Sequence, residues 1–282
     1  MEKIALFTDS ACDLTDEELK QYDIRMLPLR IIYEDREYRD RVEIHPDTVY
    51  ANLEKEVPKT SLPSGSDIED LYVDLKAAGY THAIGVMISG GLSGTANSVK
   101  MFAEEHPDMP TFVFDTKNLS MAEGLLVMET GKMIQEGLSY DEILAKLPSL
   151  QGTVDTYYYV DTLEYLMKGG RIGKVSGTIG QMLNLKPIIS VNPEGIYYTI
   201  SKARGKKQAL QRLVDLVQEN LAKSKCHVYI LHGGALEDGK LLLETVKKMD
   251  NIESIGLRQI SPALGVHTGK GLLGVCLQRL KG

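Results

Sequence analysis

The sequence feature that most restricts the fold lies between residues 82 and 105, where an apolar run, a glycine-rich loop and an amphipathic run follow one another. His82–Met87 predicts a buried strand, Ser89–Thr95 a loop, and the residues from Ala96 onward a helix. Glycine lets the backbone turn sharply and approach a ligand closely. The first N–H groups of a helix lack intrahelical partners, and together with the helix dipole they attract an anion. The loop therefore predicts a site for an oxygen-rich anionic head group, but not which molecule binds.

The alternation of strand and helix continues through the first half of the chain. Strands are expected at residues 4–7, 24–33, 82–88 and 111–114, and helices at 14–21, 46–55, 67–78, 96–105, 121–135 and 140–147. This order predicts a mostly parallel α/β sheet, in which ligands bind beyond the carboxyl ends of the strands. Asp9-Ser10, Ser89–Thr95 and Asp115-Thr116 each follow a strand, so we expect all three at one edge of the sheet.

Smaller signals predict where several elements begin. Asp13 is expected to cap the helix at 14–21, and Ser66 with Glu69 to form a capping box that opens the helix at 67–78. Two segments, 59–66 and 261–271, are expected to be loops because they are rich in Gly, Ser and Pro.

The pattern changes after Gln151, where we place a domain boundary near residue 152. Strands are then expected at 156–160, 187–191, 195–200, 227–231, 255–260 and 272–277, and helices at 163–167, 175–183, 205–222 and 236–249. A chain of 282 residues is long enough for two α/β domains. We therefore predict an N-terminal α/β domain with a mostly parallel sheet, residues 1–152, and a C-terminal α/β domain with a mixed sheet, residues 153–282.

Charge and composition exclude several classes of function. The formal net charge is −7, and no basic block is longer than Lys206-Lys207 or Lys247-Lys248, so nucleic-acid binding is not expected. The six histidines show no metal-binding spacing, so no metal site is expected. No apolar run approaches the roughly 20 residues of a membrane span, and no signal peptide precedes the first strand.

The cysteines indicate the compartment. Cys12, Cys226 and Cys276 are far apart, odd in number and without C-x-x-C spacing. They predict buried free thiols in a reducing cytoplasm rather than a disulfide or metal framework.

Hydroxyl side chains give the first candidate site. Thr60-Ser61 precedes the neighbouring strand–helix unit and could converge on Ser93, although turn and cap roles explain such hydroxyls equally well. A serine hydrolase is the enzyme alternative, with Ser93 as nucleophile, His267 as base, and Asp9 or Asp115 as the acid. A nucleophile elbow requires G-x-S-x-G. The sequence Gly91-Leu92-Ser93-Gly94-Thr95 lacks the final glycine, which argues against this alternative.

Three further segments have an ordinary structural interpretation as well as a functional one. Lys168–Lys174 lacks the residues of a phosphate loop, so it is expected to end a helix, with Arg171 available to face a partner. The basic turn around Arg204 is expected to be solvated, and a phosphate or partner contact is the alternative. A single His267 in a glycine-rich segment is more often a structural hydrogen-bonding group than a catalyst.

Taken together, the motifs resemble the DegV family, which includes the fatty-acid-binding B subunits of bacterial fatty acid kinase. The matching segments, in order, are Thr8-Asp9-Ser10, Lys59-Thr60-Ser61-x-Pro63-Ser64, Ser89–Thr95, Lys168-Gly169-Gly170-Arg171-Ile172 and His267-Thr268-Gly269-x-Gly271. The resemblance covers essentially the whole chain, and its specificity comes from the ordered set. Two positions depart from the family pattern: Leu62 stands where Gln is frequent, and Gly90 where Ser is frequent.

The resemblance implies a two-domain α/β protein that buries one long-chain fatty acid, such as palmitate, stearate or oleate, between sheet and helices near the domain junction. Thr60, Ser61 and Ser93 would hold the carboxylate, with the Gly94 amide and His267 close by. Arg204 and Arg171 would face the phosphoryl-transfer end or the partner. A separate ATP-dependent kinase subunit would phosphorylate the bound acid for phospholipid synthesis, so the chain itself would be non-catalytic and use no cofactor.

The physical chemistry of the chain is compatible with this function. Burial of an acyl tail contributes about 0.8 kcal/mol per methylene, and Met167 and Met182 could be adaptable walls of a tunnel or ordinary core residues. We also infer that hydroxyls and amides hold the carboxylate without neutralising it, which leaves its oxygen available as a nucleophile. A lipid-sensing regulatory protein without a kinase partner shares the same features, so that alternative stays open beside the hydrolase.

Overall fold

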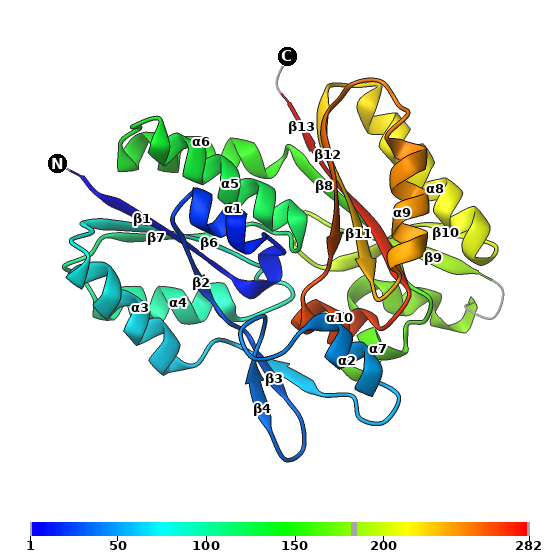
Figure 1. Ribbon diagram of the computed structural model, residues 1–282, viewed down its shortest axis with the longest axis horizontal. Helices are drawn as coiled ribbons and strands as arrows, with labels where there is room; N and C mark the ends of the chain where they lie inside the picture. The colour runs from blue at the N-terminus through cyan, green and yellow to red at the C-terminus, as the bar shows by residue number, and fades with distance from the viewer. Residues whose placement is uncertain (1, 182–184, 281–282) are drawn as a thin grey trace.

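The chain was analysed as a computed structural model that describes residues 2–181 and 185–280 (Figure 1). Its first half is built on a four-stranded sheet with the order β2-β1-β6-β7. The strands are β1 (Ile4–Asp9), β2 (Ile24–Leu27), β6 (His82–Met87) and β7 (Thr111–Asp115), and all neighbours are parallel. The expected parallel α/β sheet is thus confirmed.

Helices cover both faces of this sheet, because alternate strand residues point to opposite sides. On one face, α3 (Gly65–Ala77) and α4 (Thr95–Glu105) pack on Ala5 and Phe7 of β1. On the other face, α5 (Met121–Gln135) packs on Leu6. α1 (Asp16–Gln21) and α6 (Tyr140–Gln151) lie on the same side as α5 (Figure 1).

A second, six-stranded sheet has the order β10-β9-β8-β13-β11-β12. Only β11 and β12 are parallel, so the sheet is mixed, as expected. The strands are β8 (Val154–Tyr159), β9 (Lys186–Val191), β10 (Tyr197–Ala203), β11 (Cys226–Gly233), β12 (Ile252–Gln259) and β13 (Leu272–Arg279). Helices α8 (Gly205–Leu221) and α9 (Leu236–Val246) cover one face.

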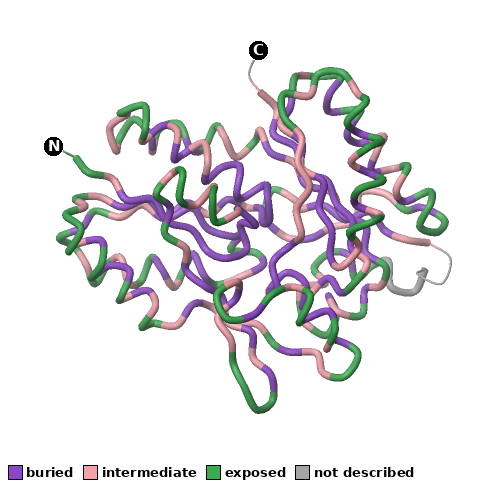
Figure 2. Tube along the Cα trace, viewed as in Figure 1, coloured by how far each residue is buried: buried purple, intermediate pink, exposed green. Residues whose placement is uncertain are grey.

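The two sheets share a hydrophobic core. α6 of the first half ends at Gln151 and β8 of the second begins at Val154, yet one cluster of buried side chains extends from Leu6 of β1 to Cys276 of β13. Figure 2 shows the buried residues concentrated in the strands of both sheets and on the inner sides of the helices. The junction between the halves is therefore a packed interior.

A three-stranded antiparallel sheet lies beside this junction (Figure 1). It has the order β4-β3-β5 and consists of β3 (Arg30–Ile32), β4 (Glu37–Arg39) and β5 (Lys59–Ser61). Helices α2 (Pro46–Asn52) and α10 (Pro262–Thr268) share a small core with it, and α7 (Glu164–Lys168) packs on α10. The sheet thus brings residues 59–61 next to residues 262–268.

Several local expectations are wrong. Residues 59–61 form a strand and residues 262–268 a helix, because each pairs or packs with a distant segment that composition does not reveal. Helix α6 continues past Pro148 to Gln151. Residues 173–181 form a 3-10 helix, η2 (Gly173–Gln181), and the rest of the helix expected at 175–183 lies outside the described residues.

Two helix caps also differ from expectation. Thr15 caps α1 in a capping box with Glu18, while Asp13 adopts a left-handed conformation with φ of 54°. Ser64, not Ser66, opens α3, and Asp67 completes its capping box. Among the described residues, no helix is both long and apolar enough to cross a membrane.

Candidate functional site

The glycine-rich loop after β6 is held by an aspartate on each side. The Ile88 N–H donates to Asp9 Oδ2 over 2.9 Å, and the Gly90 N–H donates to Asp115 Oδ1 over 3.1 Å. Asp9 and Asp115 end the strands on either side of β6, so the three polar segments meet at one sheet edge as expected. A Cβ at Gly90 would lie 2.8 Å from Asp115 Oδ2, so any larger residue at this position requires the Asp115 side chain to shift.

The same loop also contacts the second half of the chain. Ser89 Oγ donates to the carbonyl of Gly195 over 2.8 Å, and Gly195 lies in the turn between β9 and β10. A Cβ on Gly91 would approach that carbonyl oxygen to 2.5 Å. We call residues 88–95 the loop wall, because they form one side of the cavity described next.

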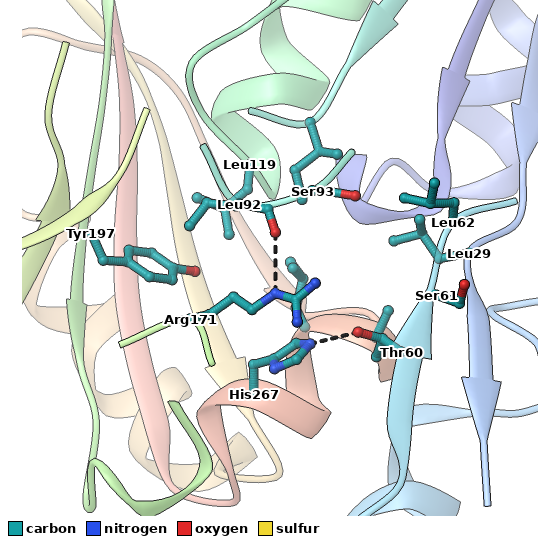
Figure 3. A pocket seen from close by; sticks show the side chains of 13 residues that line it. Leu29, Thr60, Ser61, Leu62, Leu92, Ser93, Leu119, Arg171, Tyr197 and His267 are labelled. Atoms are coloured by element: carbon teal, nitrogen blue, oxygen red, sulfur yellow. Dashed lines mark hydrogen bonds between the residues drawn. The ribbon is translucent and has the colours of Figure 1, made fainter. Parts of the chain in front are cut away.

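A cavity of 210 Å³ lies where the loop wall, β5 and α10 meet (Figure 3). Leucine side chains and hydroxyl, guanidinium and imidazole groups all line it (Figure 3). The lining residues are Leu29, Thr60, Ser61, Leu62, Ile88, Leu92, Ser93, Leu119, Arg171, Tyr197, Ala263, Leu264 and His267. The structure therefore brings Thr60, Ser61, Ser93, Arg171 and His267 together, four of them from the expected carboxylate-binding set.

His267 on α10 and Thr60 on β5 form a direct hydrogen bond. Nε2 of the imidazole lies 2.7 Å from Oγ1 of Thr60. Burial, and then the positive charge of Arg171, lower the pKa of His267 to about 4, so the ring is neutral at pH 7. A Cβ on Gly169 would lie 2.0 Å from His267 Nδ1, so glycine after α7 is required for the ring to fit.

Arg171 enters the same cavity from the segment after α7 (Figure 3). Its Nη1 donates to the Gly169 carbonyl over 2.7 Å, and its Nε donates to the Leu92 carbonyl over 3.2 Å. The sequence assigned Arg171 to the partner side and led us to expect a head-group site made of neutral groups. The cavity contains a guanidinium beside the neutral groups that were expected to hold the head group.

Helix α10, which we call the helix wall, is held by two buried aspartates of the first half of the chain. The Ser261 N–H donates to Asp13 Oδ1 over 2.8 Å, and the Ala263 N–H donates to Asp40 Oδ1 over 3.1 Å. Ser10 Oγ donates to the other oxygen of Asp40 over 2.5 Å. Burial raises the pKa of Asp13 to about 6 and that of Asp40 to about 7. Sequence reasoning expected Asp13 only as a helix cap and did not single out Asp40, since more than 200 positions separate both residues from α10.

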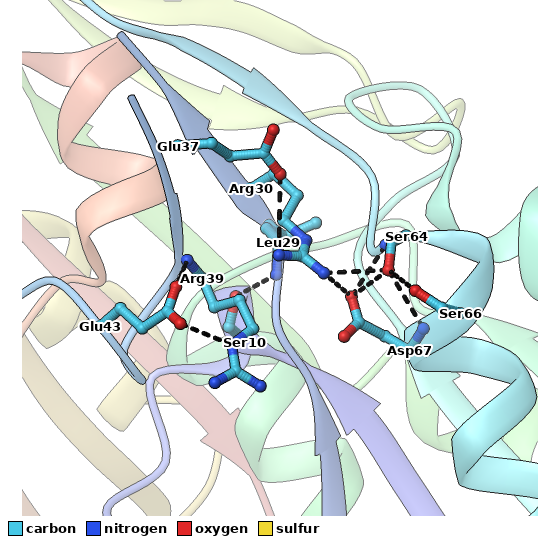
Figure 4. A network of polar contacts seen from close by, with 9 residues as sticks. All are labelled: Ser10, Leu29, Arg30, Glu37, Arg39, Glu43, Ser64, Ser66 and Asp67. Atoms are coloured by element: carbon cyan, nitrogen blue, oxygen red, sulfur yellow. Dashed lines mark hydrogen bonds and ion pairs between the residues drawn. The ribbon is translucent and has the colours of Figure 1, made fainter. Parts of the chain in front are cut away.

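A polar network fixes the small sheet that carries Thr60 (Figure 4). Arg30 on β3 donates to Ser64 Oγ over 2.9 Å and forms an ion pair with Asp67, at the start of α3. The Leu29 N–H donates to Ser10 Oγ over 3.0 Å. β3 is thereby held between β1 and α3, and β5 is paired with β3.

The remaining candidates lie outside this group. Gly94 precedes α4 beside Leu62. Arg204 is exposed at the far end of β10 from Tyr197, and a strand rise of about 3.3 Å per residue places it on the order of 20 Å away. Met167 is 44% exposed and so does not wall a buried tunnel, and Met182 lies outside the described residues.

The residues proposed for a hydrolase do not form a triad. Ser93 Oγ shares a hydrogen bond of 2.8 Å with Thr95 Oγ1, while His267 bonds Thr60. Asp9 and Asp115 bind backbone N–H groups of the loop wall, and within the described ranges neither is bonded to His267. The part of the chain that the structure describes also contains no cluster of three or more metal-ligating side chains.

The fold and the site define a two-domain α/β protein with a cavity between its two halves that leucines and polar side chains line together. Residues 3–280 match the model of a family described as "Uncharacterised protein, DegV family", and the chain belongs to that family. A DegV domain-containing protein of Clostridium acetobutylicum is 52% identical over 277 residues, 98% of this chain and 99% of that protein.

Solved structures show the same fold. A DegV family protein from Thermus thermophilus, described by its fatty acid binding, is 31% identical with a TM-score of 0.92, over 99% of this chain and 100% of that one. A fatty acid binding DegV family protein from Streptococcus agalactiae is 30% identical with a TM-score of 0.91, over 100% of both chains.

Proposed function

We propose that this chain binds one long-chain fatty acid in the cavity of 210 Å³, with the carboxylate at Thr60, Ser61, Ser93, Arg171 and His267. The observation that carries the proposal is the lining itself, because leucines adjoin a compact set of hydroxyls and one guanidinium. A fatty acid has the same division into an apolar tail and an anionic head. The fatty acid binding described for two DegV family neighbours supports the same ligand class.

The neutral imidazole of His267 gives Thr60 a defined role. When Nε2–H donates to Thr60 Oγ1, the threonine hydroxyl hydrogen is free to donate to the carboxylate. Arg171 adds positive charge, and the N-terminus of α4 behind Ser93 and Gly94 adds the positive end of a helix dipole. The carboxylate therefore gains hydrogen bonds and charge complementarity without a metal ion.

The tail requires more space than the cavity provides. Small-molecule pockets usually measure about 300–1,000 Å³, and this one measures 210 Å³. We infer that the tail displaces aliphatic side chains of the shared core beyond Leu119 and Leu264. Each buried methylene contributes about 0.8 kcal/mol, so the tail supplies most of the affinity.

We further propose that the chain is a non-catalytic subunit in the cytoplasm, which presents the bound carboxylate to a separate ATP-dependent kinase subunit. The unassembled Ser93–His267 pair supports binding without hydrolysis, and Cys12, Cys226 and Cys276 are buried free thiols that suit a reducing compartment. The kinase subunit would be tested by co-purification followed by a phosphorylation assay with ATP. A lipid sensor would bind the acid but yield no acyl phosphate with any co-purified protein.

The binding proposal is tested by calorimetric titration of the delipidated protein with palmitate, with hexadecanol as the matched ligand that lacks the charge. Palmitate should bind one-to-one, and hexadecanol about tenfold or more weakly, since hydrogen bonds to charged groups contribute about 1.5–3 kcal/mol. Arg171→Gln should remove most of that difference. Equal affinity for both ligands, or no uptake of palmitate, would contradict the proposal.

A further inference from the structure

Tyr197 lines the cavity but belongs to none of the groups assigned to the carboxylate. It is the first residue of β10 and lies two residues after Gly195, whose carbonyl accepts the hydrogen bond from Ser89. The residue is only 5% exposed, and Figure 3 shows its hydroxyl at the end of the ring that points into the cavity. This hydroxyl has no hydrogen-bond partner among the described residues. The cavity therefore contains a buried hydroxyl that a bound molecule can reach.

A second buried tyrosine fixes the orientation of the Tyr197 ring. Tyr158 on β8 meets this ring edge-on, with the two ring centroids 6.4 Å apart and an angle of 89° between the ring planes. Tyr158 itself packs closely on β13, because a Cβ on Gly274 would lie 2.7 Å from its ring. Edge-to-face pairs of aromatic rings are a favoured arrangement. The packing thus holds the Tyr197 hydroxyl toward the cavity.

The Tyr197 hydroxyl stays protonated at neutral pH. Burial, and after it the negative charge of Asp13, raise the pKa of this phenol. A protonated phenol can donate one hydrogen bond and accept another. An aliphatic chain packed against the hydroxyl provides neither bond, and a buried polar group without a partner is unfavourable. An unsubstituted acyl chain therefore leaves this hydrogen-bonding capacity unused.

We propose that the cavity prefers a fatty acid with a hydroxyl group on one of the carbons next to the carboxylate, and that Tyr197 binds this hydroxyl. The inference rests on the fatty-acid binding proposed above. It narrows the ligand class to the 2-hydroxy and 3-hydroxy fatty acids and makes Tyr197 a residue that determines specificity. A site that forms a hydrogen bond with a hydroxyl of its ligand disfavours the analogue without that hydroxyl, because its own polar group is then left unpaired.

The place of Tyr197 in the cavity restricts where the ligand hydroxyl can lie. Figure 3 shows Tyr197 across Arg171 from Thr60, which places it opposite the groups assigned to the carboxylate. Leu119, beyond which the tail is inferred to continue, lies on the same side as Tyr197 (Figure 3). Because the cavity measures only 210 Å³, the carbons that pass Tyr197 are the first few of the chain. A hydroxyl at the far end of the chain would instead be buried in the shared core.

Calorimetric titration of the delipidated full-length protein tests the inference. The ligands are palmitate, each enantiomer of 2-hydroxypalmitate and of 3-hydroxypalmitate, and 16-hydroxypalmitate. The hydroxy acids contain the same atoms and differ only in where the hydroxyl is placed. The proteins are the wild type, Tyr197→Phe and the control Tyr158→Phe. Each substitution removes one buried phenol oxygen, but Tyr158 does not line the cavity, and its hydroxyl has no partner among the described residues.

In the wild type, a 2-hydroxy or 3-hydroxy acid should bind more tightly than 16-hydroxypalmitate. Tyr197→Phe should lower the affinity of that preferred acid about fivefold relative to palmitate, which is the size expected for one hydrogen bond. Tyr158→Phe should keep the wild-type ratio. Because the order of the isomers is measured on the wild type, the inference can be tested even if a variant does not fold.

Three results would overturn the inference while palmitate still binds. If Tyr197→Phe weakens palmitate and the hydroxy acids by the same factor, Tyr197 holds the carboxylate instead. If the ratio of hydroxy acid to palmitate is the same in both variants, the cavity phenol does not bind the ligand hydroxyl. If 16-hydroxypalmitate binds as tightly as its isomers, the position of the hydroxyl has no effect. If the wild type binds none of these acids, the fatty-acid proposal itself fails, and this inference fails with it.

Discussion

The loop wall and the helix wall enclose the same cavity, and both are held by aspartates that accept hydrogen bonds from backbone N–H groups. Asp9 and Asp115 hold the loop wall, and both come from strands beside β6 in the same sheet. Asp13 and Asp40 hold the helix wall, and both come from the other half of the chain. The aspartates that hold the loop wall thus belong to the same sheet as the loop, whereas those that hold the helix wall act across the domain junction.

The two walls therefore depend on different kinds of interaction for their stability. The loop wall depends on close backbone packing, because Gly90 and Gly91 lie against Asp115 and the Gly195 carbonyl. Burial raises the pKa of carboxyl groups in both walls, to about 6 for Asp9 in the loop wall and for Asp13 in the helix wall, and to about 7 for Asp40. Steric changes should therefore disturb the loop wall most, and the strongest effect of protonation is expected at Asp40 in the helix wall.

The largest expected effect is on the pH dependence of stability through Asp40. Burial raises its pKa from 3.8 to about 7 in the folded protein. The contribution of this group to the free energy of unfolding is therefore fully present below pH 4 and is lost as the pH rises through about 7. The total loss is about 4 kcal/mol, because each unit of pKa difference corresponds to about 1.4 kcal/mol. Asp40→Asn should remove this component, so the variant should gain stability relative to wild type between pH 4 and pH 8.

Denaturant unfolding of both proteins across this pH range measures the effect. Only the difference between them isolates Asp40, because His267 contributes the opposite slope: its depressed pKa adds stability above pH 6.5 that is lost as pH falls through about 4. An unchanged difference between wild type and variant from pH 4 to pH 8 would show that Asp40 is not buried as an acid at the helix wall.

A smaller effect is expected from one methyl group in the loop wall. Gly91→Ala places a Cβ 2.5 Å from the Gly195 carbonyl oxygen, which is backbone and cannot rotate away. Overpacking of this kind costs about 1–3 kcal/mol. Gly94→Ala is the matched control in the same loop, because its Cβ would meet Leu62 at an ordinary 3.5 Å. In thermal unfolding, Gly91→Ala should have a clearly lower midpoint temperature than Gly94→Ala. Equal midpoint temperatures would contradict the packing seen at the junction.

The sequence predicts the loop wall better than the helix wall for a physical reason. The Asp9, Ser89 and Asp115 segments follow strands of a parallel sheet, and that topology brings their ends together whatever the rest of the chain does. No rule of sheet topology predicts the position of residues 262–268. Their helix is stabilised by contacts with Asp13, Asp40 and α2, which glycine content alone does not reveal, so they were expected to be a loop.

The same reasoning applies to single site residues. The resemblance to the DegV family placed Thr60, Ser93 and His267 near one another, and the structure does bring them to one cavity. Arg171 was placed on the partner side, since its position in the cavity depends on the turn after α7 and on hydrogen bonds to Gly169 and Leu92.

The smallest expected effects are on ligand affinity, and they compare the Ser93 hydroxyl of the loop wall with the Thr60 hydroxyl of β5, which is bonded to His267 of the helix wall. Ser93→Ala removes one hydroxyl from the loop wall, and Thr95, its hydrogen-bond partner, can rotate its hydroxyl toward other acceptors. We expect palmitate affinity to fall by about 0.5–1.5 kcal/mol, the usual contribution of one hydrogen bond.

Thr60→Val should have the larger effect of the two substitutions. The substitution also removes the hydrogen bond between Thr60 and Nε2 of His267. Because Nδ1 of His267 has no partner among the described residues, the buried imidazole then loses its remaining side-chain hydrogen bond. Such a loss costs about 1–3 kcal/mol. Calorimetric titration with palmitate, together with the Thr60→Val/Ser93→Ala double variant, measures whether the walls act separately. Additive losses would show that the loop wall and β5 each hold the carboxylate through their own hydroxyl, and a greater loss in Ser93→Ala than in Thr60→Val would reverse the roles assigned here.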